Sequence, residues 1–518
     1  MSDDNIKKIS LNIIDKFFEK NSLVDHHIES CNKFYNEEIK NVFKDLNPLT
    51  FSCEYNEEYK KHKYVIDIYI GGKEVDKLYF GKPMTYEKGT NKYLFPNECR
   101  LKNLTYSTTI FYDIEIEYKI YNDEKFEELI THTIEMPIKS DEDVNNHFEL
   151  GSFPIMLKSD LCILNNLDRH VCFNMGECKN DPGGYFIIDG KEKVLVPQEK
   201  FGNNIIYIRK LNDNKHDFSV EIKSVSEDSS KPKRTMAIRR NEKTKELFVD
   251  IPNVRKPVPL FILLRALGVI SDKEICQCIL SDIHKNDKYL ETLRPSINGA
   301  SIIFTQLNAL HYISTFLKIK SINETFNILT NYLLPHIGEC NYKSKALYIG
   351  YMVFELLKVI HGERNLTDRD NYAFKRVESS GYLLKDLFTE YCKIMYNNIY
   401  ITIDKDYYYN KNIYIDEDNI SDNKFNIYNL IKDNYFYVKY IENGFKKAFK
   451  GNWGEYEHTK KLGVLQDLNR LSYNSFRSHL RKVNLDIDST SKIVGPHLLH
   501  GSQYGLLDPV DTPDGGNV

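Results

Sequence analysis

The sequence predicts an α+β fold with mixed helices and strands, divided among more than one domain. Residues 64–70 and 110–118 alternate apolar and polar side chains, as half-buried strands do. Residues 257–270 and 346–360 instead place apolar side chains at helical spacing, and the first of these runs begins with prolines. At 518 residues, the chain is long enough for two or three domains, so we expect both kinds of element in several separate cores.

The bulk properties exclude a membrane protein and a secreted one. No apolar run approaches the ~20 residues that a membrane span needs, and the first ten residues, MSDDNIKKIS, are polar and acidic. Of the ten cysteines, only Cys172/Cys178 and Cys276/Cys278 lie close together, and neither pair is followed by a second one at zinc-site spacing. We therefore expect an intracellular protein with reduced thiols, no metal site and no membrane partner.

Residues 10–45 show helical apolar spacing. His26 and His27 lie beside Glu29 in this stretch, which could suggest a metal, but a surface helix is favoured because no further ligand is near. The tract at 401–440 is rich in Tyr, Asn, Asp and Lys. It is either a low-complexity insertion or, as we favour, ordinary helix and loop in a biased composition.

A hairpin is predicted within residues 183–196. Gly183 and Gly184 permit a sharp turn, and two short apolar runs flank Asp189-Gly190, a dipeptide typical of tight hairpin turns. A phosphate-binding loop is a weaker interpretation, because no Gly-rich helix entry and no Gly-Lys-Ser/Thr sequence follows.

A basic stretch stands out near the end of the chain. Residues 446–482 hold nine Lys or Arg against three acids, in a chain whose net charge is −4. Such an excess is typical of phosphate-backbone binding, although a solvated helix face is the alternative. The spacing of Leu465, Leu468, Leu471 and Phe476 predicts the apolar face of a helix. The arginines would project from its other faces.

Four blocks of sequence carry a resemblance to a known family. They are residues 95–107 (FPNECRLKNLTYS), 151–199, 366–381 and 450–518, the last with GNWG, SHLRK and HLLHGSQYGLLDPVDTPDGGN. In this order they resemble the second-largest subunit of multi-subunit DNA-directed RNA polymerases, of the eukaryotic, archaeal and large DNA virus type. The resemblance covers about residues 10 to 518. The AT-biased composition favours a giant virus as the source.

The resemblance implies the protrusion, lobe and fork of that subunit, with antiparallel sheets. Residues 1–198 would be the N-terminal segment and first part of the protrusion, and 199–375 the lobe inserted into it. Residues 376–445 would be the second part of the protrusion, and 446–518 a truncated fork. We expect the C-terminal half of the subunit, with the family's zinc site, to be a separate partner, through a split gene, an intron boundary or a truncation.

The family further implies a nucleotidyltransferase that carries out DNA-templated RNA synthesis. This chain would be one subunit of that enzyme and would be inactive alone. The catalytic Mg²⁺ would be held by aspartates of the largest subunit, so no catalytic or metal-binding residue is expected here. Partners would be the DNA template, nascent RNA and other polymerase subunits. The location would be the virion and host cytoplasm for a virus, or the nucleus for a cellular eukaryote. The alternative is a non-catalytic nucleic-acid-binding or assembly fragment of a split subunit.

Twelve residues are carried over as candidates for nucleic-acid contact, lining the cleft wall and fork loop. They are Gln466, Asn469, Arg470, Arg477, His479, Arg481, Lys482, Lys492, His497, Pro513, Asp514 and Asn517. Lys482 stands where the family usually has Arg, which keeps the charge but loses bidentate geometry. Asp514 replaces a glutamate, and we expect its carboxylate to position neighbouring groups rather than to bind metal. A second basic run, at 224–245, either contacts downstream DNA or forms a solvated hairpin.

Overall fold

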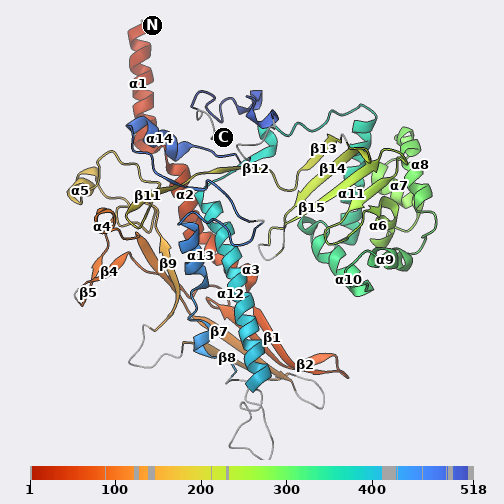
Figure 1. The fold of residues 1–518 in the computed structure, drawn as a ribbon, viewed down its shortest axis with the longest axis horizontal. Coiled ribbons are helices and arrows are strands. Elements are labelled where there is room, and N and C mark those ends of the chain that lie inside the picture. The colour runs from red at the N-terminus through yellow and green to blue at the C-terminus, as the bar shows by residue number, and fades with distance from the viewer. Residues whose placement is uncertain are drawn as a thin grey trace, which may run out of the picture. The chain divides into compact units, whose positions relative to one another are not determined.

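The computed structural model describes residues 3–87, 89–121, 128–137, 146–211, 213–228, 231, 233–410, 428, 430–457, 459–485, 487 and 494–511. They form two compact units (Figure 1). Unit 1 contains the described parts of Met1–Lys200 and Val377–Ser491. Unit 2 contains those of Phe201–Arg376 and Lys492–Thr512. The assignment of sequence ranges to protrusion, lobe and fork stays a prediction.

Both units combine helices with antiparallel sheets, which confirms the α+β fold class. The sheets of unit 1 are β1–β2–β7–β8, β3–β6–β9, β10–β11–β19 and the hairpin β4–β5. Their strands are β1 (Leu49–Asn56), β2 (Lys61–Ile70), β3 (Leu78–Phe80), β4 (Met84–Glu87), β5 (Thr90–Tyr93), β6 (Ser107–Tyr112), β7 (Ile114–Tyr121), β8 (Glu128–Met136), β9 (Phe148–Pro154), β10 (Phe186–Ile188), β11 (Lys191–Leu195) and β19 (Leu465–Asp467).

The predicted strand at 110–118 is wrong in one respect, since it is two strands. β6 and β7 belong to different sheets and are separated by Asp113. The Asp113 carboxylate is buried and lies 2.8 Å from Nδ1 of His147. The alternation of side chains runs unbroken through both strands, so periodicity alone could not reveal that the chain changes sheet at this residue.

Unit 1 also contains α-helices. They are α1 (Asp3–Lys20), α2 (Asp25–Lys33), α3 (Ile39–Leu46), α4 (Pro96–Lys102), α5 (Arg169–Asn174), α12 (Ser380–Asn410), α13 (Tyr440–Ala448) and α14 (Tyr473–Arg481). Of these, α1 has only exposed side chains among residues 5–18. Phe388 of the long helix α12 makes edge-on ring contacts with Phe34 and Phe43, and also with Phe445 of α13. The Tyr- and Asn-rich tract at 401–440 begins inside α12, so residues 401–410 are ordinary helix. Residues 411–427 and 429 of the tract lie outside the described residues.

Unit 2 contains a five-stranded antiparallel sheet and six α-helices among its described residues. The strands are β13 (Ile206–Lys210), β14 (His216–Ser224), β15 (Arg234–Asn241), β16 (Leu247–Asp250) and β17 (Val258–Pro259). The helices are α6 (Leu260–Ala266), α7 (Asp272–Leu280), α8 (Leu290–Gly299), α9 (Gln306–Ser314), α10 (Ile322–Asn327) and α11 (Tyr342–Ile360). β12 (Gln198–Phe201) and β18 (Lys375–Glu378) lie where the chain passes from one unit to the other.

The second basic run belongs to this sheet. β15 is its middle strand, hydrogen-bonded to β14 on one side and β16 on the other. Arg240 donates from Nε to Asp217 at 2.9 Å, and Arg239 lies 3.2 Å from Asp250. Two basic side chains of this run therefore form ion pairs with carboxylates of neighbouring strands.

No helix in the described part of the chain has the length and apolar character needed to cross a bilayer.

Candidate nucleic-acid interface

Helix α14 carries the central residues of the predicted interface, and a local signal defines where it begins. Ser472 accepts a hydrogen bond from the backbone N–H of Ser475 at 3.1 Å, and Ser475 Oγ accepts one from the backbone N–H of Ser472 at 2.8 Å. This reciprocal capping satisfies two backbone donors at the helix start. The helix ends at Arg481, because Lys482 adopts extended backbone.

The predicted helix through Leu465 and Leu471 is therefore wrong. Leu465 lies in strand β19, which pairs with β11 in the register Leu195↔Leu465. Leu471 is 90 % exposed and precedes the cap. The free edge of the β10–β11 hairpin supplies backbone partners to this segment, so strand pairing overrides the helical spacing of its leucines.

The inner side of α14 is fixed to unit 1 by packing and by His27. Phe476 and Leu480 are buried with Tyr185 in one apolar cluster. His27 of α2 lies 2.7 Å, through Nε2, from the backbone oxygen of Leu480 (Figure 1 shows α14 beside the start of α2). Burial, aided by the neighbouring His26, lowers the pKa of His27 to about 4. The expected surface helix is thus wrong for His27, which is fully buried.

Arg470 precedes α14, and its side chain, which is 43 % exposed, lies in an ion cluster that also includes Arg100, Glu177, Asp181, Tyr185 and Glu192. Its Nε and Nη2 donate to the two Glu192 oxygens at 2.7 and 2.9 Å. Its Nη2 also lies 3.3 Å from Asp181 and 3.1 Å from the Tyr185 hydroxyl. Its guanidinium carbon is 4.3 Å from the ring centre of Phe476.

Arg100 completes the ion cluster from the opposite side. It reaches Glu177 and Glu192 at 2.8 Å each and the Tyr185 hydroxyl at 2.9 Å. Burial alone would raise the pKa of the Glu192 carboxyl, but hydrogen bonds and charge from Arg470 and Arg100 lower it. Glu192 is therefore held as a carboxylate between two guanidinium groups.

Three further candidates form one hydrogen-bonded group. The backbone N–H of Asn469 donates to His479 Nδ1 at 3.0 Å, and His479 Nε2 lies 3.0 Å from Gln466 Oε1. Because Nδ1 accepts, the proton of the neutral ring is on Nε2, which donates to Gln466. Burial, with the charge of Lys482, lowers the pKa of His479 and favours this neutral form.

The exposed face of α14, which we define as Tyr473, Arg477 and Arg481, differs from this inner side. Arg477 Nη2 donates to the Tyr473 hydroxyl at 2.6 Å, and its guanidinium carbon lies 4.2 Å from that ring centre. Arg481 donates to the backbone oxygen of Leu23 at 2.9 Å. Within the described ranges, neither arginine has a carboxylate at ion-pair distance, and the same holds for Lys482. Their positive charges are therefore not balanced by a carboxylate of the described residues.

Other basic residues of the stretch are already paired. Lys446 contacts Glu442 at 2.6 Å, Lys447 contacts Glu455 at 3.2 Å, and Lys461 contacts Glu378 at 2.8 Å. The local charge excess is therefore smaller at the surface than the sequence suggests.

The remaining candidates lie in unit 2 or outside the described residues. His497 is exposed in a single turn, Gly495–His497, of unit 2. In the same unit His500 Nε2 lies 2.8 Å from Asp368, and the backbone N–H of Tyr372 donates to Ser502 Oγ at 2.9 Å. Lys492, Pro513, Asp514 and Asn517 lie outside the described residues.

Sequence reasoning missed the partners of these candidates. Tyr473, four residues before Arg477, could have been found from helical spacing. The carboxylates around Arg470 could not, because Glu192 and Asp181 lie 278 and 289 residues away in the chain.

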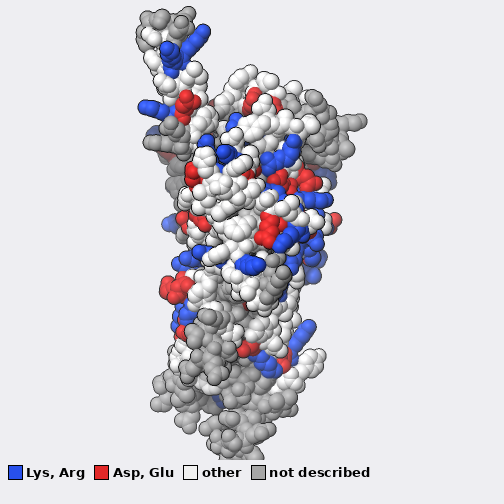
Figure 2. Space-filling model, turned by 90° about the vertical axis from the view of Figure 1, so that its left-hand side faces the viewer, with Lys and Arg blue, Asp and Glu red and all other residues white. Residues whose placement is uncertain are grey.

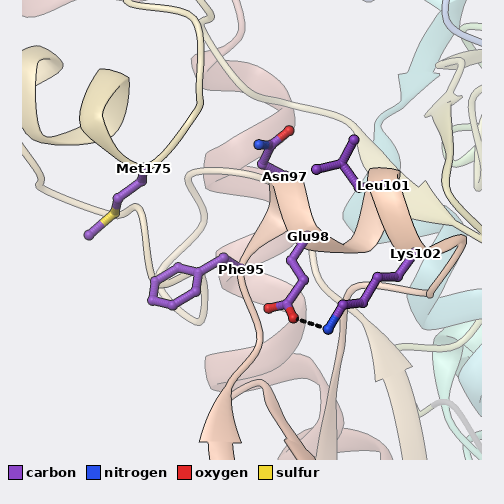
Figure 3. Close-up of a pocket in the computed structure, with 6 residues that line it drawn as sticks. All are labelled: Phe95, Asn97, Glu98, Leu101, Lys102 and Met175. Carbon is purple, nitrogen blue, oxygen red and sulfur yellow. Dashed lines mark hydrogen bonds and ion pairs between the residues drawn. The ribbon is translucent and has the colours of Figure 1, made fainter.

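A pocket of about 310 Å³ lies elsewhere in unit 1, between α4 and the end of α5 (Figure 3). It is lined by Phe95, Asn97, Glu98, Leu101, Lys102 and Met175. Glu98 and Lys102 point toward each other across one turn of α4 and lie 2.5 Å apart. On the side of unit 1 that carries α4 and α5, Figure 2 shows basic and acidic side chains intermixed, with no extended patch of one sign. None of the candidate residues lines this pocket.

The described residues contain no group of three or more His, Cys, Asp or Glu side chains arranged to hold a metal ion. All ten cysteines are described, and all are free thiols. The donor set that a Mg²⁺ or structural Zn²⁺ site requires is thus not found among these residues.

Comparison with known proteins identifies the family. A family model described as "RNA polymerase beta subunit" matches residues 22–424, and one described as "RNA polymerase Rpb2, domain 3" matches residues 466–518. The chain belongs to the RNA polymerase beta subunit family. The resemblance seen in the sequence motifs is thereby confirmed.

Curated relatives agree with this assignment. DNA-directed RNA polymerase II subunit RPB2 of Encephalitozoon cuniculi is 32 % identical over 98 % of this chain and 42 % of its own length. The subunit 2 of Arabidopsis thaliana RNA polymerase II is 32 % identical over 97 % of this chain and 42 % of its own length. The archaeal subunit Rpo2N of Methanothermobacter thermautotrophicus is 27 % identical over 99 % of this chain and 93 % of its own length. The chain thus spans about two fifths of the two eukaryotic relatives.

Proposed function

We propose that this chain is a subunit of a DNA-directed RNA polymerase and takes part in DNA-templated RNA synthesis. Family membership over most of the chain supports the proposal, as do relatives named as subunits of that enzyme. The reaction is a nucleotidyl transfer, and we assign no catalytic residue to this chain. The Mg²⁺ that the reaction uses would be held by the largest subunit.

The exposed face of α14 would contribute to the wall of the nucleic-acid cleft. The observation that carries this step is the lack of a carboxylate partner for Arg477, Arg481 and Lys482 among the described residues, while the other arginine of this stretch, Arg470, is paired. Unpaired guanidinium groups suit phosphate oxygens, and Tyr473 stiffens Arg477 by stacking. His497, Lys492, Pro513, Asp514 and Asn517 stay proposed contacts from the family motif.

The partners would be the DNA template, nascent RNA, the largest subunit, other polymerase subunits and the C-terminal part of the second-largest subunit. An intracellular location follows from the same proposal, and a giant virus as the source stays a prediction. A non-catalytic assembly fragment is not favoured, because the relatives of known name are polymerase subunits.

The test is RNA extension on an RNA–DNA scaffold with NTPs and Mg²⁺. The chain alone is expected to make no RNA, and the enzyme assembled from this chain and the remaining subunits is expected to extend the RNA. An assembly that omits this chain serves as the control. Extension by the chain alone, or equal extension without it, would contradict the proposal.

A further inference from the structure

We infer that Arg470 is a positioning residue, which orients α14 toward nucleic acid without touching nucleic acid itself. The inference rests on the proposed function for the identity of the ligand. It concerns the ion cluster that contains Arg470. The family motif predicts Arg470 only as one of several basic residues that contact nucleic acid.

Two of the three guanidinium nitrogens of Arg470, Nε and Nη2, donate to protein groups. Nε and Nη2 both donate to Glu192, and Nη2 also reaches Asp181 and the Tyr185 hydroxyl. Its flat face lies against the ring of Phe476, with 4.3 Å between the guanidinium carbon and the ring centre. A bidentate pair with one carboxylate together with ring stacking fixes both the position and the plane of the group.

The charges around Arg470 disfavour a phosphate. The cluster contains two arginines and three carboxylates, of Glu177, Asp181 and Glu192. A phosphate approaching Arg470 would meet two of these carboxylates within the first contact layer of the same guanidinium. Like charges repel strongly in partly buried surroundings, so this site retains its arginine and excludes an anion.

The ion cluster joins segments that are far apart in the chain. Arg100 comes from α4, Glu192 from β11, and Arg470 from the residues between β19 and the α14 cap. Three of the four sequence blocks that carry the family resemblance therefore meet in this cluster. Together they determine how the segment that leads into α14 lies on the β10–β11 hairpin.

Arg470 is also close to the groups that orient α14. It is two residues from the Ser472 cap, and it stacks on Phe476, whose neighbour Arg477 is on the exposed face of α14. Loss of Arg470 would remove the guanidinium that stacks on Phe476. It would also remove the ion pair with Glu192, which lies close to the α14 cap. The exposed cations would keep their charge but lose their fixed position.

A positioning role and a contact role predict opposite results for one substitution. Glu192→Gln removes the carboxylate charge and weakens the bidentate hydrogen bonds that fix the Arg470 side chain. If Arg470 contacted phosphate, removing this competing carboxylate would tighten nucleic-acid binding. If Arg470 positions α14, the same substitution weakens binding, because the anchor is lost.

The experiment measures binding of an RNA–DNA scaffold by the assembled polymerase over a series of salt concentrations. Arg470→Gln, Glu192→Gln and the double variant are each expected to weaken binding by about tenfold, a value within the coupling range of one ion-pair network. The double variant is expected to be no worse than either single one. The salt slope stays that of the wild type, because no phosphate contact is lost.

Two further variants make the test decisive. Arg470→Lys keeps the charge but loses the bidentate geometry, so it should behave as Arg470→Gln does. Arg240→Gln in unit 2 is the matched control, since Arg240 is paired with Asp217 and lies 5.2 Å from the Phe218 ring centre. It should leave scaffold binding unchanged.

Four results would overturn the inference: tighter binding by Glu192→Gln, a salt slope lowered by about one in Arg470→Gln, wild-type binding by Arg470→Lys, or equal weakening by Arg240→Gln. A wild-type assembly that does not bind the scaffold would instead contradict the proposed function.

Discussion

Two groups of basic residues lie within the same 21-residue stretch of unit 1, residues 461–481, and their surroundings differ. Lys461 faces the buried carboxylate of Glu378, and Arg470 faces the partly buried carboxylate of Glu192, while Arg477 and Arg481 lie on the exposed face of α14. Burial would raise the pKa of Glu378, but the charges of Lys461 and Lys200 lower it to about 2. The first group fixes the fold of this region, and the second is available to a ligand. A count of charges along the chain cannot separate them.

The largest effect on stability is expected where the inner side of α14 is packed. Phe476→Ala removes a ring that is 3 % exposed and that contacts Arg470 and Tyr185. It should lower the free energy of unfolding by about 3–5 kcal/mol, the usual cost of truncating a buried aromatic side chain. Denaturant unfolding measures this change.

Leu471→Ala is the control, because Leu471 is 90 % exposed and should change stability by less than about 0.5 kcal/mol. Equal losses for the two variants would mean that α14 is not packed on unit 1 as described.

The next effect depends on pH and acts through His27. Its pKa falls from 6.5 in the unfolded chain to about 4 in the fold, so the unfolded chain binds the proton more readily between these values. Stability is therefore fully present above pH 6.5 and is lost as the pH falls toward 4, by on the order of 3 kcal/mol. Unfolding measured across this range should show the loss.

His27→Gln separates this contribution from those of other histidines, since the amide can still donate to Leu480 but does not titrate. The variant should lose less stability between pH 6.5 and 4.5. Protonation of Glu378 does not interfere in this window, because its lowered pKa places its effect below pH 4.5. An identical pH profile for wild type and variant would show that His27 is not buried against α14.

The sequence predicted the elements whose signals are local. The hairpin at Asp189-Gly190 is confirmed, since the two residues have φ values of 49° and 76° and join β10 to β11. Helix α11 was recognised because its apolar spacing continues for several turns. The family motifs likewise predicted the α+β fold class and the family.

The features that depend on distant residues were not predictable. The leucines at 465–471 fit a helix by spacing, but the edge of β11 pairs with Leu465 and makes a strand. The ion pairs of Arg470 depend on Glu192 and Asp181, and the hydrogen bond of buried His27 depends on Leu480. Such contacts form only when the chain has folded, so spacing within one segment carries no signal for them.

The exposed face of α14 should show the smallest effect on stability and the clearest effect on binding. Arg477→Gln combined with Arg481→Gln removes two charges that no described carboxylate balances, and each surface change should alter stability by less than about 0.5 kcal/mol. Lys285→Gln in unit 2 is a matched control, since that lysine is 83 % exposed and lies 3.8 Å from its carboxylate partner.

The decisive measurement is the salt dependence of scaffold binding by the assembled polymerase that carries the Arg477→Gln, Arg481→Gln double variant. If both arginines contact phosphates, the slope of the logarithm of affinity against the logarithm of salt concentration should fall by about two, one for each lost contact. Lys285→Gln should leave the slope unchanged. A wild-type slope in the double variant would contradict the account, because it would show that the exposed face of α14 does not bind the nucleic-acid backbone.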